Sequence, residues 1–155
     1  MTKLVTEELV IDGFKSNDVD FPACLQRSPR QQDFVDKVVL PLVATMTSAA
    51  DTAVLLIIAH SDRVDDQGPD REQRRARELD VSVVRAQSAL DEVVRRVQVE
   101  LAAQGRTVED QMKARVQLIQ VPSGAANLAV SGPSLDALQR EANRRVTFSG
   151  VRFVP

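Results

Sequence analysis

Cysteine, histidine and bulky aromatic residues are scarce in this chain of 155 residues. It contains one cysteine (Cys24), one histidine (His60), five phenylalanines, and neither tryptophan nor tyrosine. A single cysteine excludes an internal disulfide and the usual cysteine-based zinc frameworks. Since aromatic rings provide the surfaces on which unpaired bases stack, their scarcity argues against single-stranded nucleic-acid binding.

The sequence also has no excess of positive charge and no long apolar run. Its 20 Lys and Arg residues face 22 Asp and Glu residues, which leaves no overall basic field for a polyanion such as nucleic acid. No segment approaches the roughly 20 apolar residues that cross a bilayer, so we expect no membrane span. The N-terminus lacks a secretory signal. Removal of a leader would leave the same sequence, and we would then expect a location in the periplasm or cell envelope; without a leader, we expect synthesis in the cytoplasm.

Hydrophobic periodicity predicts strands and helices in alternation. The predicted strands are residues 7–14, 53–59, 114–121 and 144–154, and the second of these should be internal to its sheet because it is continuously apolar. The predicted helices are residues 34–43, with a kink at Pro41, a long helix from about 83 to 104, and a short one at 134–142. Residues 15–29 are rich in turn formers and predict a loop.

This order, β-α-β-α-β-(α)-β, indicates an α/β (α+β) two-layer sandwich. About four strands form a mixed sheet, and two long helices and a short helix accompany it. The length fits a single domain with its core at about 7–154. Residues 65–79 interrupt the pattern with a turn-forming stretch and an arginine-rich one. We interpret this segment as an insertion, either a solvated helical turn or a flexible loop.

Three short motifs carry a resemblance to a known family. They are IIAHSD at residues 57–62, VSVVRAQSAL at 81–90 and EANRRVTF at 141–148. Together, and in this order, they resemble the motifs of OmpA-like domains, the peptidoglycan-binding modules also found in Pal lipoproteins and MotB-type stator proteins. The resemblance covers about residues 7–154.

The resemblance implies a non-catalytic clamp for the diaminopimelate of the peptidoglycan stem peptide. The free end of a diaminopimelate side chain carries an ammonium and a carboxylate on one carbon, so its receptor needs an anion beside a cation. Asp62 could accept from the ammonium, and the planar fork of Arg85 could bind the carboxylate, aided by a position near the start of a helix. The predicted ligand-binding residues are Asp62, Arg85, Ser61, Asn143 and Arg144; Arg145 completes the last motif.

The chain departs from the family pattern at three places. Ala59 stands where the family has glycine, 23 residues separate Asp62 from Arg85 where the family's loop is commonly shorter, and Glu78, Leu79 and Asp80 occupy the neighbourhood of an expected asparagine. The first departure alters the close approach of the backbone to a ligand. The second places the insertion beside the pocket.

Each candidate residue also has a purely structural interpretation. Asp62 and Arg85 could form a salt bridge, Asn143 and Arg144 could serve as a cap and a surface charge, and Cys24 could be inert. His60 is interpreted as a packed residue, because the adjacent Ser61 would point to the opposite face and two ligands do not make a metal site. We expect no metal and no cofactor.

Two functions therefore stay open. The first is a peptidoglycan-binding domain that anchors a partner or assembly to the cell wall. The alternative is a degenerate OmpA-like structural or assembly domain without a ligand, for example in a phage-tail-like contractile injection particle. No set of residues indicates an enzyme.

Overall fold

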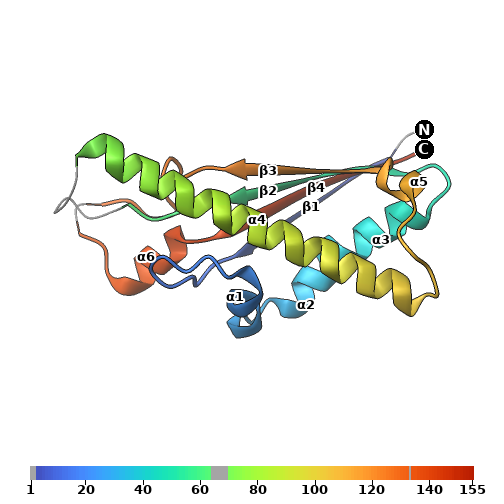
Figure 1. Ribbon diagram of the computed structural model, residues 1–155, viewed down its shortest axis with the longest axis horizontal. Coiled ribbons are helices and arrows are strands. Elements are labelled where there is room, and N and C mark those ends of the chain that lie inside the picture. The colour runs from blue at the N-terminus through green and yellow to red at the C-terminus, as the bar shows by residue number, and fades with distance from the viewer. Residues whose placement is uncertain (1–2, 64–69, 133) are drawn as a thin grey trace.

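The computed structural model describes residues 3–63, 70–132 and 134–155. It consists of a mixed four-stranded sheet with helices packed beside it (Figure 1). The α/β fold class and the predicted order of the main elements are confirmed. The strands are β1 (Lys3–Ile11), β2 (Thr52–Ala59), β3 (Val116–Pro122) and β4 (Val146–Val154). The helical elements are α1 (Phe21–Arg27), α2 (Gln31–Phe34), η1 (Val35–Val39), α3 (Leu40–Thr47), α4 (Arg71–Ala103), α5 (Asp110–Lys113) and α6 (Ala137–Asn143).

The strands lie in the order β1-β4-β2-β3. The last strand of the chain enters between the first two and runs antiparallel to both, whereas β2 and β3 are parallel and are joined through α4. β2 is therefore internal to the sheet, as predicted. The first strand is four residues earlier at its start than expected, at Lys3 in place of Glu7.

The segment predicted as a loop at residues 15–29 contains a helix, α1, which corrects that prediction. Asp20 caps it by accepting a hydrogen bond from the backbone N–H of Ala23 at 2.9 Å, and Pro22 occupies the first turn, where its missing N–H costs nothing. The helix places Phe21 in the core, where its ring packs against Phe34 and Phe148 with centroids 5.5 Å away in each case. Four of the five phenylalanines meet here, since Phe14 also contacts Phe21.

The helical region around Pro41 is longer than predicted, because α2, η1 and α3 follow one another without a break from Gln31 to Thr47. The irregularity expected at Pro41 takes the form of the π-helical turn η1, in which the N–H of Leu40 donates to the carbonyl of Val35. A π turn lets the helix pass a residue that has no N–H to donate.

The long helix α4 begins at Arg71, about three turns before the predicted start at residue 83. Asp70 caps it by accepting from the N–H groups of Glu72 and Gln73, at 3.0 Å each. The arginine-rich half of the predicted insertion is therefore the first part of α4. Residues 65–69 of that insertion lie outside the described residues.

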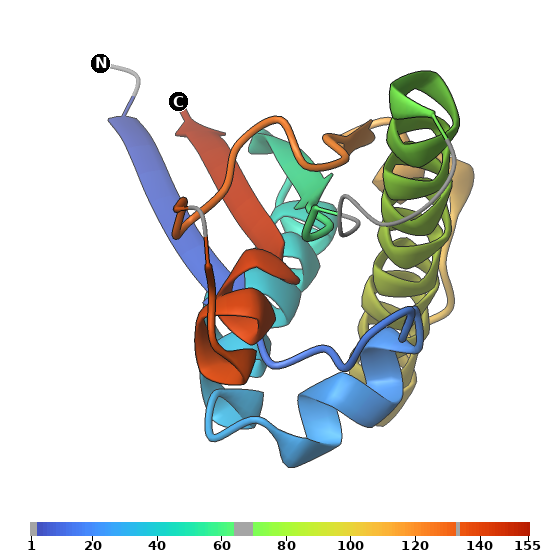
Figure 2. The same ribbon diagram turned by 90° about the vertical axis from the view of Figure 1, so that its left-hand side faces the viewer.

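The helices gather on one side of the sheet, as Figure 2 shows. β2 alternates accordingly, with Ala53, Leu55, Ile57 and Ala59 buried and the residues between them only partly so. None of the helices in the described ranges is both apolar enough and long enough to cross a membrane. The carboxyl end of β2 points toward the start of α4, and the candidate residues lie there.

Candidate functional site

A cavity of about 330 Å³ opens where β2 ends, between the first half of α4 and α6. Its walls come from four parts of the chain that are distant in sequence. They are Ser16, Asn17, Ser61, Asp62, Arg63, Arg77, Glu78, Val81, Arg85, Arg140 and Arg144. Four of the five predicted ligand-binding residues, namely Ser61, Asp62, Arg85 and Arg144, are thus brought to one cavity.

Asp62 is buried and paired with the end of the chain, not with Arg85. Its Oδ2 accepts a hydrogen bond from Nη1 of Arg140 at 3.0 Å, and Nη2 of Arg144 lies 3.5 Å from the same oxygen. Its Oδ1 accepts from Nδ2 of Asn143 at 3.0 Å. The structure shows no ion pair between Asp62 and Arg85 among the residues it describes, so the salt bridge considered between them is not formed.

Asn143 lies behind Asp62 and outside the lining of the cavity. Its Nδ2 also donates to the carbonyl of Val130 at 2.9 Å, and its Oδ1 accepts from the N–H of Val130 at 2.9 Å. A fully buried side-chain amide with these three bonds is held in one orientation. It therefore fixes the position of the Asp62 carboxylate.

The short helix α6 brings Arg140 and Asn143 to Asp62. A capping box starts it: Asp136 accepts from the N–H of Gln139, and the side chain of Gln139 accepts from the N–H of Asp136. Arg140 was missed in the sequence, although its position one helical turn before Asn143 and Arg144 is the signal that could have found it. The sequence did not predict that Glu78 and Arg77 line the cavity, because their segment was interpreted as an insertion and not as the first turns of α4.

Arg85 is fully buried and uses its guanidinium mainly on the backbone. Nη1 donates to the carbonyl of His60, and both Nε (3.2 Å) and Nη2 donate to the carbonyl of Asp18. The group stacks on the ring of Phe14, 4.4 Å from its centroid. Arg85 thus ties the loop after β1 to the end of β2 while it borders the cavity.

The expectation that the helix dipole aids carboxylate binding at Arg85 is wrong. α4 begins at Arg71, so Arg85 lies about four turns inside the helix, beyond the first turn in which free N–H groups are available. Burial lowers the pKa of Arg85 to about 10, against the opposing effect of Asp18, and the group keeps its charge at neutral pH. A guanidinium has five N–H groups, and two of those on Arg85 make no hydrogen bond within the described part of the chain.

Ser61 lines the cavity and carries a hydroxyl that the described part of the protein leaves unused. Its side chain is buried and its Oγ has no hydrogen-bond partner among the described residues. Its backbone is firmly held, because its N–H donates to the carbonyl of Gly124 at 2.8 Å. Buried hydroxyls without a partner are uncommon, which marks this oxygen as one that a ligand could satisfy.

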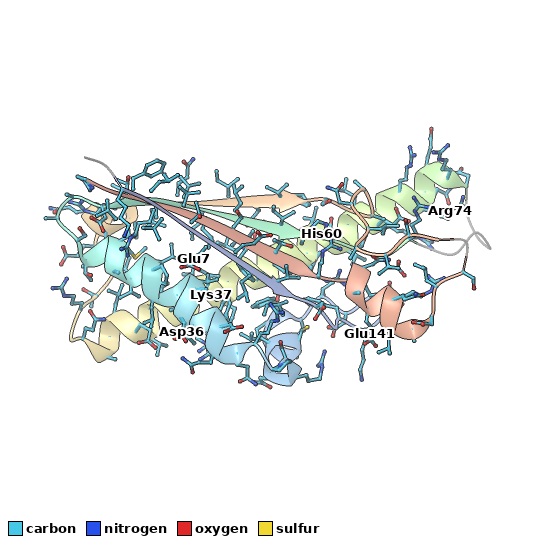
Figure 3. The ribbon with its side chains drawn as sticks, turned by 180° about the vertical axis from the view of Figure 1, so that it is seen from behind. Glu7, Asp36, Lys37, His60, Arg74 and Glu141 are labelled. Atoms are coloured by element: carbon cyan, nitrogen blue, oxygen red, sulfur yellow. The ribbon has the colours of Figure 1, made fainter. Side chains whose placement is uncertain are left out.

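His60, seen at the end of β2 in Figure 3, is a buried neutral residue. Burial, with the charges of Arg145 and Arg85, lowers the pKa of His60 to about 4, and its Nδ1 has no hydrogen-bond partner in the described ranges. Arg145, which follows α6, donates from Nη2 to the carbonyl of Asn127 at 2.9 Å. Neither residue lines the cavity.

In the part of the chain that the structure describes, no group of three or more His, Cys, Asp or Glu residues converges. Cys24 is buried and its Sγ donates to the carbonyl of Asp12 at 3.3 Å. Burial raises the pKa of its thiol to about 11. Such a thiol stays protonated and is a poor nucleophile.

Comparisons with known proteins give matches of structure only. No protein-family model and no curated protein matches the chain. The chain is similar to the cell wall anchor of the T6SS from Pseudomonas aeruginosa, with 19% sequence identity, a TM-score of 0.46, and coverage of 94% of this chain and 85% of that one. It is also similar to a MotB-like protein from Desulfovibrio vulgaris, with 17% identity, a TM-score of 0.42, and coverage of 95% and 74%. Both similarities concern the fold, so function is inferred below from the chain's own side chains.

Proposed function

We propose that this chain is a non-catalytic peptidoglycan-binding domain that holds the diaminopimelate of a stem peptide and anchors a partner or an assembly to the cell wall. The observation that carries the proposal is the convergence of Ser61, Asp62, Arg85 and Arg144 on one cavity. Its volume of about 330 Å³ lies at the small end of the range for ligand pockets and suits an amino-acid head group.

The carboxylate of the ligand is assigned to the arginines. Arg85 retains two N–H donors, and Arg144 is only loosely held by Asp62 at 3.5 Å. Two N–H groups of a guanidinium match the two oxygens of a carboxylate. Because Arg85 is anchored by backbone carbonyls, it loses little side-chain freedom when a ligand binds.

The ammonium of the ligand is assigned to Asp62 and Ser61. The Oδ2 of Asp62 can accept from an ammonium if the ligand's carboxylate draws Arg144 away, and the free Oγ of Ser61 supplies a second acceptor. A few charge-assisted bonds of about 1.5–3 kcal/mol each give an affinity in the micromolar to millimolar range for one stem. Firm attachment then depends on several copies binding one polymer.

A degenerate assembly domain is the second candidate, and one observation favours it. Both oxygens of Asp62 already accept hydrogen bonds from the protein, one from Arg140 and one from Asn143. An acid that is satisfied in this way can serve the fold alone, by tying α6 to the end of β2.

The test is sedimentation with insoluble diaminopimelate-type peptidoglycan. Ser61→Ala is the sharpest variant, because Oγ has no partner within the described fold and its removal leaves no protein group unsatisfied. Asp62→Asn keeps the shape of the side chain and removes its charge. Asp51→Asn is the matched control, since Asp51 pairs with Arg152 at 3.8 Å and neither residue lines the cavity.

We expect the wild type and Asp51→Asn to pellet equally, Ser61→Ala to bind about tenfold more weakly, and Asp62→Asn to bind more weakly still. Thermal melts establish that each variant is folded. Equal pelleting of all four proteins would place the wall contact elsewhere. No pelleting of the wild type would favour the assembly domain.

A further inference from the structure

A second cavity, larger than the first, lies against the opening turns of α4. Its volume is about 590 Å³. It is lined by Arg63, Arg71, Arg74, Arg75, Glu78, Leu79, Ser123, Gly124, Ala125 and Ala126. Figure 3 shows Arg74 on this part of the helix, in the same half of the molecule as His60. The two cavities share Arg63 and Glu78 and differ in every other residue.

Positive charge dominates this second cavity. Four arginines line it against one carboxylate, that of Glu78. Within the ranges that the structure describes, the guanidinium groups of Arg63, Arg71 and Arg75 form no hydrogen bond and no ion pair. Like charges gathered around one hollow repel one another, and a bound anion would remove that repulsion.

Another part of the wall is the loop at residues 123–126, which hydrogen bonds hold in place. The N–H of Gly124 donates to Oγ of Ser82 at 3.0 Å, and that hydroxyl donates in turn to the carbonyl of Leu79 at 2.7 Å. The N–H of Ser123 donates to the carbonyl of Ala59 at 2.9 Å. The next N–H, that of Ala125, donates to no described residue, so a backbone donor is available on this wall.

We infer that this second cavity binds an oxyanion that carries two or more negative charges. The N–H groups of an arginine match the paired oxygens of a phosphate or a carboxylate. Several arginines around one cavity require a ligand with more than one negative charge to balance theirs. The volume accommodates a group larger than a single phosphate. The chemistry fits either a phosphoryl group with several charges or clustered carboxylates. The inference of an oxyanion site does not depend on the diaminopimelate site, since Arg71 and Arg75 line this second cavity and not the first.

Calorimetric titration with inorganic pyrophosphate and, separately, with citrate tests the inference and distinguishes the two sources of charge. Arg71→Ala/Arg75→Ala removes two cations from the first turns of α4, where alanine is the best helix former and the fold should be kept. The matched control is Arg106→Ala/Lys113→Ala, which removes the same charge beyond the other end of α4 and at the end of α5.

We expect the wild type and the control pair to bind at least one of the two anions, and the Arg71/Arg75 pair to bind it at least about tenfold more weakly. Preference for pyrophosphate identifies a phosphoryl ligand, and preference for citrate identifies a carboxylate one. Failure of the wild type to bind either anion, or equal binding by both double variants, overturns the inference. Sedimentation of Arg71→Ala/Arg75→Ala with peptidoglycan separates this result from the fate of the diaminopimelate site.

Discussion

A buried arginine is stable only where its charge and its donors find partners, and Arg85 meets this condition through the backbone. The carbonyls of Asp18 and His60 accept three of its hydrogen bonds, and the ring of Phe14 covers one face of the guanidinium. Arg85 therefore organises the cavity before any ligand arrives. This is also why Arg85→Ala is a poor test of binding, since it would orphan two carbonyls and open a hole in the core.

His60 predicts a pH dependence of folding. In the folded protein its pKa is lowered to about 4, so between pH 6.5 and 4 the unfolded chain takes up a proton that the folded chain refuses. Stability that is present above pH 6.5 is therefore lost as the pH falls toward 4, by about 3 kcal/mol. Urea unfolding at a series of pH values measures the free energy of unfolding at each pH.

The control for this pH dependence is His60→Phe, which fills a similar volume and cannot titrate. Carboxylates also titrate in the same range, so the informative quantity is the difference between the two proteins. The wild type should lose more stability than His60→Phe between pH 6.5 and 4. Parallel curves would mean that His60 has an ordinary pKa in the folded state.

Among the elements, the loop that follows β3 depends on one backbone conformation. Gly124 has φ +55°, and a β-carbon there would meet the backbone of Leu79 at 3.6 Å, an ordinary contact distance. Gly124→Ala should therefore cost about 1 kcal/mol from the left-handed conformation alone. Gly132→Ala is the matched control, because its β-carbon meets only the side chain of Leu135 at 3.6 Å. Denaturant unfolding of both variants checks this; equal stability would exclude a conformational role for Gly124.

Elements with strong periodicity were predicted well, and those fixed by a few residues were not. β2 and the body of α4 follow from long apolar patterns. α1 has seven residues and depends on one cap and one proline, so the turn-forming residues around it concealed it. The start of α4 was missed because its first turns carry charges and little apolar surface, whereas the Asp70 cap, which is visible in the sequence, marks the true start.

The order of the strands in the sheet could not be predicted from the sequence, because it depends on contacts between distant segments. The insertion of β4 between β1 and β2 brings Phe148 beside Ile57 and places α6 at the end of β2. That placement decides the partners of Asp62. The sequence identified Asp62, Arg85, Ser61, Asn143 and Arg144 as candidates and their convergence was expected, but the pairing of Asp62 with Arg140 arises only from the fold.

At the scale of the whole molecule, charge is separated although the total is nearly balanced. The chain has a formal charge of -2, yet eight arginines and only two carboxylates, Asp62 and Glu78, line the two cavities at one end of the described structure. The composition could not reveal this separation of charge, since a net charge does not say where in the fold the charged residues lie. A local positive field of this kind attracts anions even when the protein as a whole is acidic.

The separation of charge predicts that the proposed attachment to peptidoglycan weakens with salt. Raising the ionic strength from about 0.01 M to about 1 M shortens the screening length from about 30 Å to about 3 Å, which removes the field beyond the cavities while leaving the buried bonds of Arg85 largely intact. Sedimentation over this range should show a steady loss of the pelleted fraction, with unchanged melting behaviour. The opposite face of the sheet provides the contrast, because Leu4, Val121 and Phe153 are exposed and apolar. Attachment through those side chains would hold or strengthen as salt increases, and that outcome would move the wall contact away from the arginines.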